Sequence, residues 1–225
     1  MVPLPIIEDL GFIDFSDCLV YQEKLFNYLI QYRQSATEVP NYLLLCEHPH
    51  VITLGKSGNT ANLLAKDDLL KKKGVSFYHI SRGGDITYHG PGQLVVYPII
   101  NLNTYNLTVR RYVELLEQTV INLLSGVGIT ATRMDGATGI WIDAGITGKC
   151  RKICAIGIRV SHQVTMHGLA FNVNTDLSYF NLINPCGLTG RGVTSLAAET
   201  GKYWNMDVIK KLLTKTFSEL LCSRQ

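Results

Sequence analysis

Cys186 is the cysteine whose surroundings best suit a reactive thiol. It lies between Pro185 and Gly187 in NLINPCGLTGRG, which has no apolar period and is typical of a loop. A thiol with an ordinary pKa of about 8.5 holds little thiolate at neutral pH, so a nucleophilic cysteine needs help, such as a neighbouring cation that lowers this pKa. Four other cysteines lie in apolar helical or strand patterns and are expected to be buried and unreactive: Cys18, Cys46, Cys154 and Cys222.

Lys152 is a second candidate for chemistry. It opens a strand-like segment, in GKCRKICAIGIRV, whose following residues are small and apolar. Such a lysine either keeps its amine in water at the end of a core strand or places a functional amine in a site. From this segment alone the first interpretation is favoured. His167, in MHGLAFNVN, is in the same way interpreted as a structural histidine when it is taken alone.

The stretch RGGDITYHGPGQLVVYP, from Arg82 to Pro98, is unusually rich in glycine. It is not a P-loop, because no Gly-Lys-Ser/Thr follows and the next element is a strand rather than a helix. Glycine clusters most often mark tight turns. Here the glycines stand among cationic, hydroxyl, imidazole and amide groups: Arg82, Thr87, Tyr88, His89 and Gln93. This combination suits a pocket wall where a thin ligand lies against main chain and a few polar groups hold its head.

Composition and charge exclude several classes of protein. The 225 residues are 46% apolar and 17% charged, which indicates a globular chain that can form a sizeable core. A net charge of +3 is weak support for nucleic-acid binding. The cysteine spacing predicts neither a disulfide framework nor a metal site. No signal peptide or membrane span is expected, so we expect a cytoplasmic protein with reduced thiols.

The chain shows no repeat or linker, so one domain over residues 1–225 is expected. Helical periodicity and capping residues predict helices over 16–33, over 65–73 with closure at Gly74, after Thr108, and from Asn205 to about Leu221. Strands are predicted for these segments: 4–7, NYLLLC, VITLG, VSFYHI, 93–102, GITATR, GIWID, 152–160 and 164–173. The last two form an expected antiparallel hairpin. This mixture without strict alternation predicts an α/β or α+β domain with a mixed sheet.

Taken together, these motifs resemble a known family. The pattern Arg82-Gly83-Gly84-x-x-Thr87-Tyr88-His89-x-x-Gly92-Gln93-x-Val95-x-Tyr97 is similar to the signature of the lipoate-protein ligase B family. The likeness continues, in the same order, through RKICAIGIRV, HGLAFNVNTDL and INPCGLTGRGVTSL. The resemblance implies a fold similar to the catalytic domain of biotin and lipoate protein ligases. It implies transfer of an octanoyl (or lipoyl) group without a cofactor or metal.

The resemblance also implies roles for individual residues. Cys186 is the implied nucleophile and Lys152 its partner in the catalytic pair, whereas Lys149 does not match the motif. The implied acyl pocket consists of Arg82, Gly83, Gly84, Asp85, Ile86, Thr87, Tyr88, His89, Ala155, Ile156, Gly157, Gly168, Leu169 and Ala170. Tyr88 and His89 are expected to wall the channel. Arg82 is expected either to brace its loop or to meet a phosphate of the carrier.

Implied partners are octanoyl-acyl carrier protein as donor, and as acceptors the lipoyl domains of 2-oxoacid dehydrogenases and the glycine cleavage H protein. No nucleic-acid or membrane partner is expected. One alternative is an ATP-dependent lipoate or biotin-type ligase on the same fold. A cysteine hydrolase and a non-enzymatic acyl-binding module are two further alternatives.

Overall fold

The computed structural model describes residues 3–33, 39–185 and 191–223, so Cys186 lies outside the described residues. Its main feature is a seven-stranded mixed sheet. Six strands follow the order β1-β2-β6-β9-β8-β10, and the seventh, β7, pairs with β8. The β1–β2 and β8–β10 pairs are parallel and the other pairs are antiparallel. The strands are β1 (Ile6–Phe12), β2 (Tyr42–Glu47), β6 (Gln93–Ile99), β7 (Ile140–Ile142), β8 (Arg151–Ser161), β9 (Val164–Asn172) and β10 (Gly192–Val193). The mixed-sheet prediction is confirmed.

A smaller, three-stranded sheet carries the glycine-rich stretch. Its order is β4 (Ser76–His79), β3 (Val51–Leu54) and β5 (Ile86–His89), with β3–β4 parallel and β3–β5 antiparallel. The loop before β5 contains Arg82, Gly83 and Gly84, and the chain then returns to the large sheet as β6. The glycine-rich stretch therefore links the two sheets.

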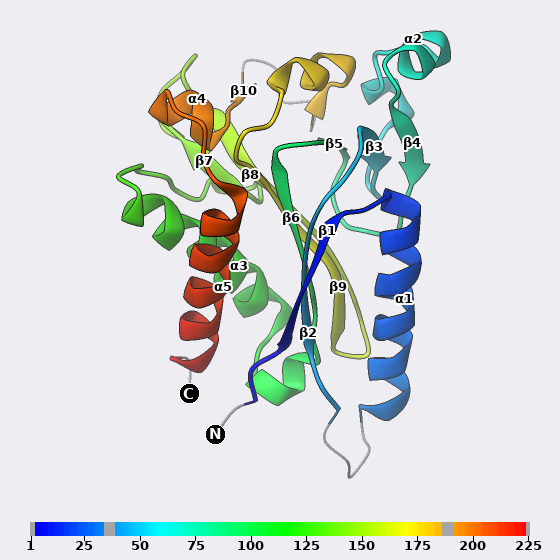
Figure 1. Ribbon diagram of the computed structural model, residues 1–225, viewed down its shortest axis with the longest axis vertical. Coiled ribbons are helices and arrows are strands. Elements are labelled where there is room, and N and C mark those ends of the chain that lie inside the picture. Colours follow the sequence, from blue (N-terminus) through cyan, green and yellow to red (C-terminus); the bar gives the residue numbers. More distant parts are fainter. Residues whose placement is uncertain (1–2, 34–38, 186–190, 224–225) are drawn as a thin grey trace.

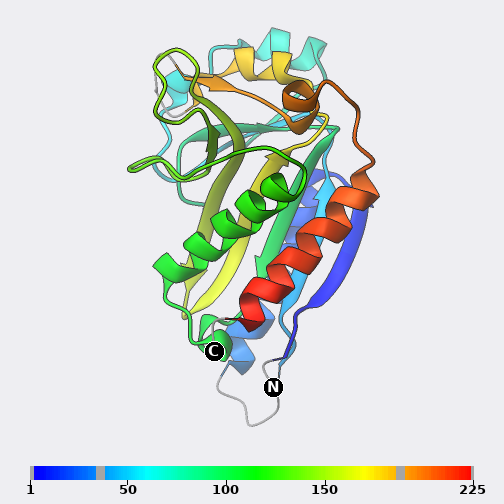
Figure 2. The same cartoon turned by 90° about the vertical axis from the view of Figure 1, so that its left-hand side faces the viewer.

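Helices cover both faces of the large sheet (Figures 1 and 2). On one face lies α1 (Phe15–Tyr32), and on the other lie α3 (Val109–Gly126) and α5 (Met206–Cys222). Each face has its own buried apolar cluster, because neighbouring residues of a strand point to opposite sides. The shorter helices are α2 (Asp67–Lys72), α4 (Leu196–Thr200), η1 (Thr60–Asn62), η2 (Leu102–Tyr105) and η3 (Leu177–Leu182).

Local sequence signals account for several boundaries. Thr108 and Asn205 cap α3 and α5, accepting hydrogen bonds from the backbone of Arg111 and Asp207. The predicted hairpin of β8 and β9 turns through two consecutive residues of positive φ, His162 at 51° and Gln163 at 64°. Such a pair matches the right-handed twist of the strands that it joins.

Some boundaries differ from the prediction. The first strand is Ile6–Phe12 rather than 4–7, because β1 is an edge strand, largely exposed, where acidic residues are tolerated. The segment GITATR forms only an isolated bridge, from Thr132 to Trp141. The strand expected over 93–102 ends at Ile99, since η2 begins at Leu102. The helix expected over 65–73 is α2, Asp67–Lys72. Among the described residues, no helix has the length and apolarity that crossing a membrane requires.

Candidate active site

A cavity of about 560 Å³ lies between the large sheet and the loop that precedes β5. Ala155 and Gly157 of β8 and Gly168 and Ala170 of β9 contribute to its lining. They are cross-strand partners, Ala155 with Ala170 and Gly157 with Gly168. Because these side chains are small or absent, the sheet surface here leaves space that larger residues would fill. All residues expected from the family resemblance to line an acyl pocket line this cavity, except Tyr88.

The glycines allow the loop to approach the sheet closely. Gly83 N donates a hydrogen bond to the carbonyl of Ile158 at 2.8 Å. A Cβ atom at Gly157 would lie only 2.8 Å from the Gly83 carbonyl oxygen and 3.1 Å from Arg82 Cδ. The backbone of the loop therefore rests directly on β8 and forms one wall of the cavity.

Arg82 is mostly buried and braces this loop. Its Nη2 donates to the carbonyl oxygen of Thr53 at 2.7 Å and to Thr53 Oγ1 at 2.9 Å, and its Nη1 donates to the Gly83 carbonyl at 3.0 Å. The sequence suggested two roles for Arg82, and these contacts fit the first, the bracing of its loop. Contact of Arg82 with a carrier phosphate stays a prediction.

His89 is a buried, neutral wall of the cavity. Its Nδ1 lies 2.8 Å from Gln93 Oε1, while Gln93 Nε2 donates to Asn172 Oδ1 at 2.8 Å and to the Tyr88 carbonyl at 3.1 Å. Since the Gln93 oxygen accepts, His89 Nδ1 carries the proton. Burial, together with the nearby His48 and Arg82, lowers the pKa of His89 to about 3. His89 is thus a hydrogen-bonding group rather than a cation at neutral pH.

Tyr88 does not line the cavity, contrary to the expectation that it walls the channel. It follows Thr87 and precedes His89 in β5, so its side chain points to the opposite side of the strand. Its hydroxyl hydrogen-bonds His50 Nδ1 at 2.8 Å and its ring stacks on Tyr179, with 5.2 Å between centroids. Burial raises the pKa of Tyr88 above its usual range. Its position indicates a structural contact behind the wall.

Lys152 lines the cavity at the end of β8, together with Pro185 and Val193. Its Nζ donates to the Thr138 carbonyl at 3.2 Å and lies 4.6 Å from the centroid of a Trp141 ring. Pro185 is the residue before Cys186, and Val193 is the register partner of Lys152 in the β8–β10 pair. Pro185, which precedes residues 186–190, and Val193, which follows them, therefore line the same cavity as Lys152.

An ion-pair network holds the strand end that carries Lys152. Arg151 Nε and Nη2 donate to the two carboxylate oxygens of Glu199, each at 2.6 Å, and Arg151 Nη1 donates to Asp143 Oδ2 at 2.6 Å. Thr194 Oγ1 donates to Glu199 Oε1 at 2.5 Å, and Thr194 N donates to the Lys152 carbonyl at 2.9 Å. This network joins β7, β8 and the start of α4 around Lys152.

His167, which the sequence analysis interpreted as a structural histidine, is among the residues that line the cavity. It is 2% exposed, lines the cavity, and its Nε2 has no hydrogen-bond partner among the described residues. Burial, with the positive charges of Arg82 and Arg159 nearby, lowers the pKa of its imidazole to about 3. No local signal distinguishes such a histidine from a satisfied structural one, because the absent partner is a property of the packed fold.

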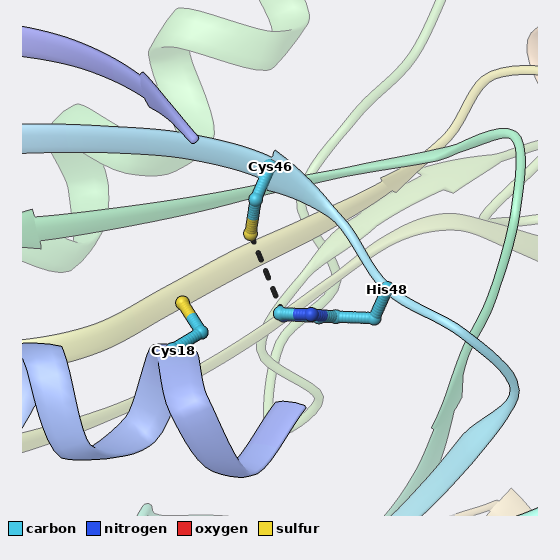
Figure 3. A group of neighbouring side chains, drawn as sticks. All are labelled: Cys18, Cys46 and His48. Atoms are coloured by element: carbon cyan, nitrogen blue, oxygen red, sulfur yellow. Dashed lines mark hydrogen bonds between the residues drawn. The ribbon is translucent and has the colours of Figure 1, made fainter. Parts of the chain in front are cut away.

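Cys18, Cys46 and His48 form a second, separate group (Figure 3). Their Sγ and ring nitrogen atoms lie within 4.8 Å of one another, all are buried, and in the described part of the chain they are the one such set that could hold a metal. His48 Nδ1 donates to the Ile13 carbonyl at 2.8 Å, and His48 Nε2 accepts from the Tyr97 hydroxyl at 2.8 Å. Burial raises the pKa of Cys46 well above its usual value, which favours a thiol over the thiolate that a metal needs.

The fold is similar to that of solved lipoate and biotin protein ligases. A bi-partite lipoate protein ligase from Thermoplasma acidophilum matches with a TM-score of 0.69 at 18% identity, over 97% of this chain and 84% of that chain. A biotin protein ligase from Aquifex aeolicus matches with a TM-score of 0.55 at 16% identity, over 98% and 72% of the two chains. These likenesses define the fold class, and they confirm the fold expected from the sequence.

The chain belongs to the family of the lipoyl protein ligase A/B catalytic domain, whose model matches residues 16–218. A curated relative from Parabacteroides distasonis, named octanoyltransferase, is 50% identical over 212 residues, covering 94% of this chain and 96% of the relative. The family resemblance read from the motifs is thereby confirmed.

Proposed function

We propose that this protein is an octanoyltransferase that moves an octanoyl group from acyl carrier protein to a lysine of a lipoyl domain. Full-length similarity to a protein named octanoyltransferase supports this activity. The observation that carries the proposal is the cavity itself, whose lining combines glycine and alanine of β8 and β9 with Lys152 and Pro185. An alkyl chain fits such a lining, because it needs length and apolar contact rather than hydrogen bonds.

The proposed mechanism proceeds in two steps. In the first, the Cys186 thiolate attacks the thioester carbonyl carbon of the donor, a carbon–sulfur bond forms, and the carrier's thiolate leaves. One thioester replaces another, so this exchange is nearly isoenergetic. In the second, the acceptor lysine amine attacks the acyl-enzyme, an amide forms and the Cys186 thiolate is released. Splitting the reaction in this way lets each carrier protein bind in turn.

Lys152 has two roles in this mechanism. As an ammonium it stabilises the Cys186 thiolate and the negative charge that develops in the first step. The ammonium then gives its proton to the departing carrier thiolate, and the resulting neutral amine accepts the proton that the attacking lysine loses in the second step. The position of Lys152 in the cavity lining and the presence of Pro185, the neighbour of Cys186, in the same lining support this assignment.

The test is intact mass spectrometry after mixing the protein with octanoyl-acyl carrier protein in the absence of ATP. The wild type is expected to gain one octanoyl group, Cys186→Ser none, and a lipoyl domain should discharge the adduct. Lys152→Met is expected to reduce transfer at least about 100-fold, a loss in the range that general acid–base catalysis contributes. The exposed Lys149 provides the control, and Lys149→Met should transfer normally.

Each contrary outcome points to a different function. Transfer that requires ATP would support a ligase that activates the free acid. Release of free octanoate without an acceptor would support a hydrolase. Tight octanoyl binding without an adduct or transfer would support an acyl-binding module.

A further inference from the structure

Gly139 leaves the space in which the Lys152 side chain lies. Its φ is +121°, a conformation that favours glycine. A Cβ atom at Gly139 would lie 2.6 Å from the Cys154 carbonyl oxygen, and 3.3 Å and 3.5 Å from Cε and Cδ of Lys152. The lysine stem therefore passes against bare main chain before its Nζ reaches the Thr138 carbonyl at 3.2 Å.

Trp141 gives the lysine amine a second contact. Lys152 Nζ lies 4.6 Å from the centroid of a Trp141 ring, within the distance at which the face of an indole attracts a cation. The two residues are register partners in the antiparallel pair of β7 and β8. Residues directly opposite in such a pair have their side chains on the same face of the sheet, which brings the indole and the lysine stem together.

The indole of Trp141 is itself fixed. The residue is 2% exposed, and its Nε1 donates to the Ala137 carbonyl at 2.9 Å. Its backbone N–H and carbonyl both pair with Thr132, each at 2.9 Å. A lysine amine on a four-carbon stem can adopt many rotamers, so a rigid ring beside it restricts where its charge lies.

The same residue contacts the chain that follows residues 186–190. The guanidinium carbon of Arg191 lies 5.6 Å from the centroid of a Trp141 ring. Arg191 is the first described residue after the segment that contains Cys186. Trp141 thus contacts both Lys152 and the chain that returns from this segment.

Glu117, in α3, carries the carboxylate that bonds the backbone of Gly139. Its Oε1 accepts from Gly139 N at 3.3 Å, and its Oε2 pairs with Arg133 Nε at 2.8 Å. These contacts involve no atom of Trp141. A substitution of Trp141 therefore leaves the partners of this carboxylate in place.

Trp141 supports the cavity without lining it. Ala137 and Thr138 line the cavity together with Lys152, whereas Trp141 does not. The indole nitrogen and the lysine amine both bond to carbonyls of this wall, those of Ala137 and Thr138. An effect of Trp141 on a reaction in the cavity must therefore act through a neighbour such as Lys152.

We propose that Trp141 is the positioning residue of Lys152, its indole face holding the lysine ammonium at the cavity where the Cys186 thiolate forms. This inference rests on the proposed function, in which that ammonium stabilises the thiolate. The face of an indole attracts the charged amine far more than the neutral one. Without the ring the ammonium would spread over more rotamers, and the thiolate would lose part of its stabilisation.

The test follows the rate at which iodoacetamide alkylates Cys186 as a function of pH. The Cys186 peptide is read by mass spectrometry, because the exposed Cys222 reacts as well. Trp141→Leu and Trp141→Met remove the ring, whereas Trp141→Phe keeps an aromatic face without the indole nitrogen. Trp141→Leu is also combined with Lys152→Met.

The matched control is Trp204→Leu. Trp204 is the other tryptophan of the chain, and Lys202 Nζ lies 4.2 Å from the centroid of its ring. Neither Trp204 nor Lys202 lines the cavity. This variant removes a similar contact between an indole and an ammonium at a place where no effect on Cys186 is expected.

Trp141→Leu and Trp141→Met are expected to raise the pH midpoint of Cys186 alkylation by about 0.5–1 unit, a part of the roughly 1–3 units that a neighbouring opposite charge contributes. Octanoyl transfer should fall at least about tenfold in kcat with KM within about twofold, because Trp141 does not line the cavity. Trp141→Phe and Trp204→Leu should keep the midpoint within about 0.3 unit of the wild type. In Lys152→Met, Trp141→Leu should add no further shift, because the ring then has no ammonium to hold.

An unchanged midpoint in both ringless variants would overturn the positioning role. A shift of equal size when Trp141→Leu is added to Lys152→Met would also overturn it, since the ring would then act without the lysine. An equal shift in Trp204→Leu would do the same. A wild type that transfers no octanoyl group would refute the proposed function instead, and the alkylation midpoints would still decide the role of Trp141.

Discussion

The ion pair of Arg151 and Glu199 gives the sharpest test of how the strand end that carries Lys152 is held. Glu199→Gln removes the negative charge but keeps the shape and one acceptor oxygen. Two charged hydrogen bonds of 2.6 Å are weakened. Hydrogen bonds to charged groups contribute about 1.5–3 kcal/mol. Because the Arg151 side chain is 28% exposed and that of Glu199 13%, solvent screening reduces this contribution. The expected loss in the free energy of unfolding is therefore about 1–2 kcal/mol.

The corresponding change in melting temperature follows from chain length. An unfolding entropy of about 2.1 cal/mol/K per residue over the 225 residues is about 0.5 kcal/mol/K. A loss of about 1–2 kcal/mol then lowers Tm by about 2–4 °C, measured by circular dichroism at pH 7. The control is Glu114→Gln, which breaks the exposed i,i+4 pair with Arg110. Such pairs contribute about 0.3–0.5 kcal/mol, so its Tm should fall by about 1 °C or less.

The pH dependence has a definite sign. The hydrogen bond from Arg151 lowers the pKa of Glu199 below its ordinary value of 4.5. The stabilisation is therefore fully present above pH 4.5 and is lost as the pH falls through the lowered pKa of the folded state. The Tm difference between the wild type and Glu199→Gln should shrink on acidification below this range. A difference that is absent at pH 7, or that stays constant down to the acid limit of folding, would refute the reasoning.

Three further predictions follow from burial and close contact. His89, with a pKa of about 3, should stay neutral from about pH 5 to 8 in histidine NMR spectra, and a transition near pH 6.5 would contradict its assigned burial. The expectation that Cys222 is buried was wrong: it is exposed at the end of α5 and should react with a thiol reagent in the native protein, whereas Cys46 should react only after unfolding, because burial raises its pKa. Gly157→Ala places a Cβ 2.8 Å from the Gly83 carbonyl oxygen, so the free energy of unfolding should fall by about 1–3 kcal/mol in a denaturant titration. An unchanged denaturation midpoint would show that the loop moves away from β8 without loss of stability.

Of the 14 pocket residues that the family resemblance implied, 13 line the cavity, because they belong to a few continuous segments. The glycines at 83 and 84 predicted a pocket wall of exposed main chain, and the structure brings their loop onto β8, where Gly83 N donates to the Ile158 carbonyl. Thr108 and Asn205 marked helix starts through bonds to residues only two to three positions away. Local signals of this kind depend on neighbours in the chain, so the sequence alone contains them.

Other features arise only when distant segments pack together. Tyr88 and His89 are adjacent residues of the same motif. Tyr88 nevertheless points toward His50 and away from the cavity. Cys18 and Cys46 were expected to be buried and inert, and the structure confirms their burial but also brings them beside His48.

His167 illustrates most clearly the difference between what local sequence shows and what packing decides. Its residue type and its position before a glycine were visible in the sequence, and they are typical of an ordinary structural histidine. Its unpaired Nε2 depends on which groups α1, β6 and β8 place around it. The sequence by itself determined the family, the main elements and the types of many residues that line the cavity. Only the tertiary structure decided which of those residues face the cavity, because hydrogen-bond partners across a sheet come from segments far apart in the chain.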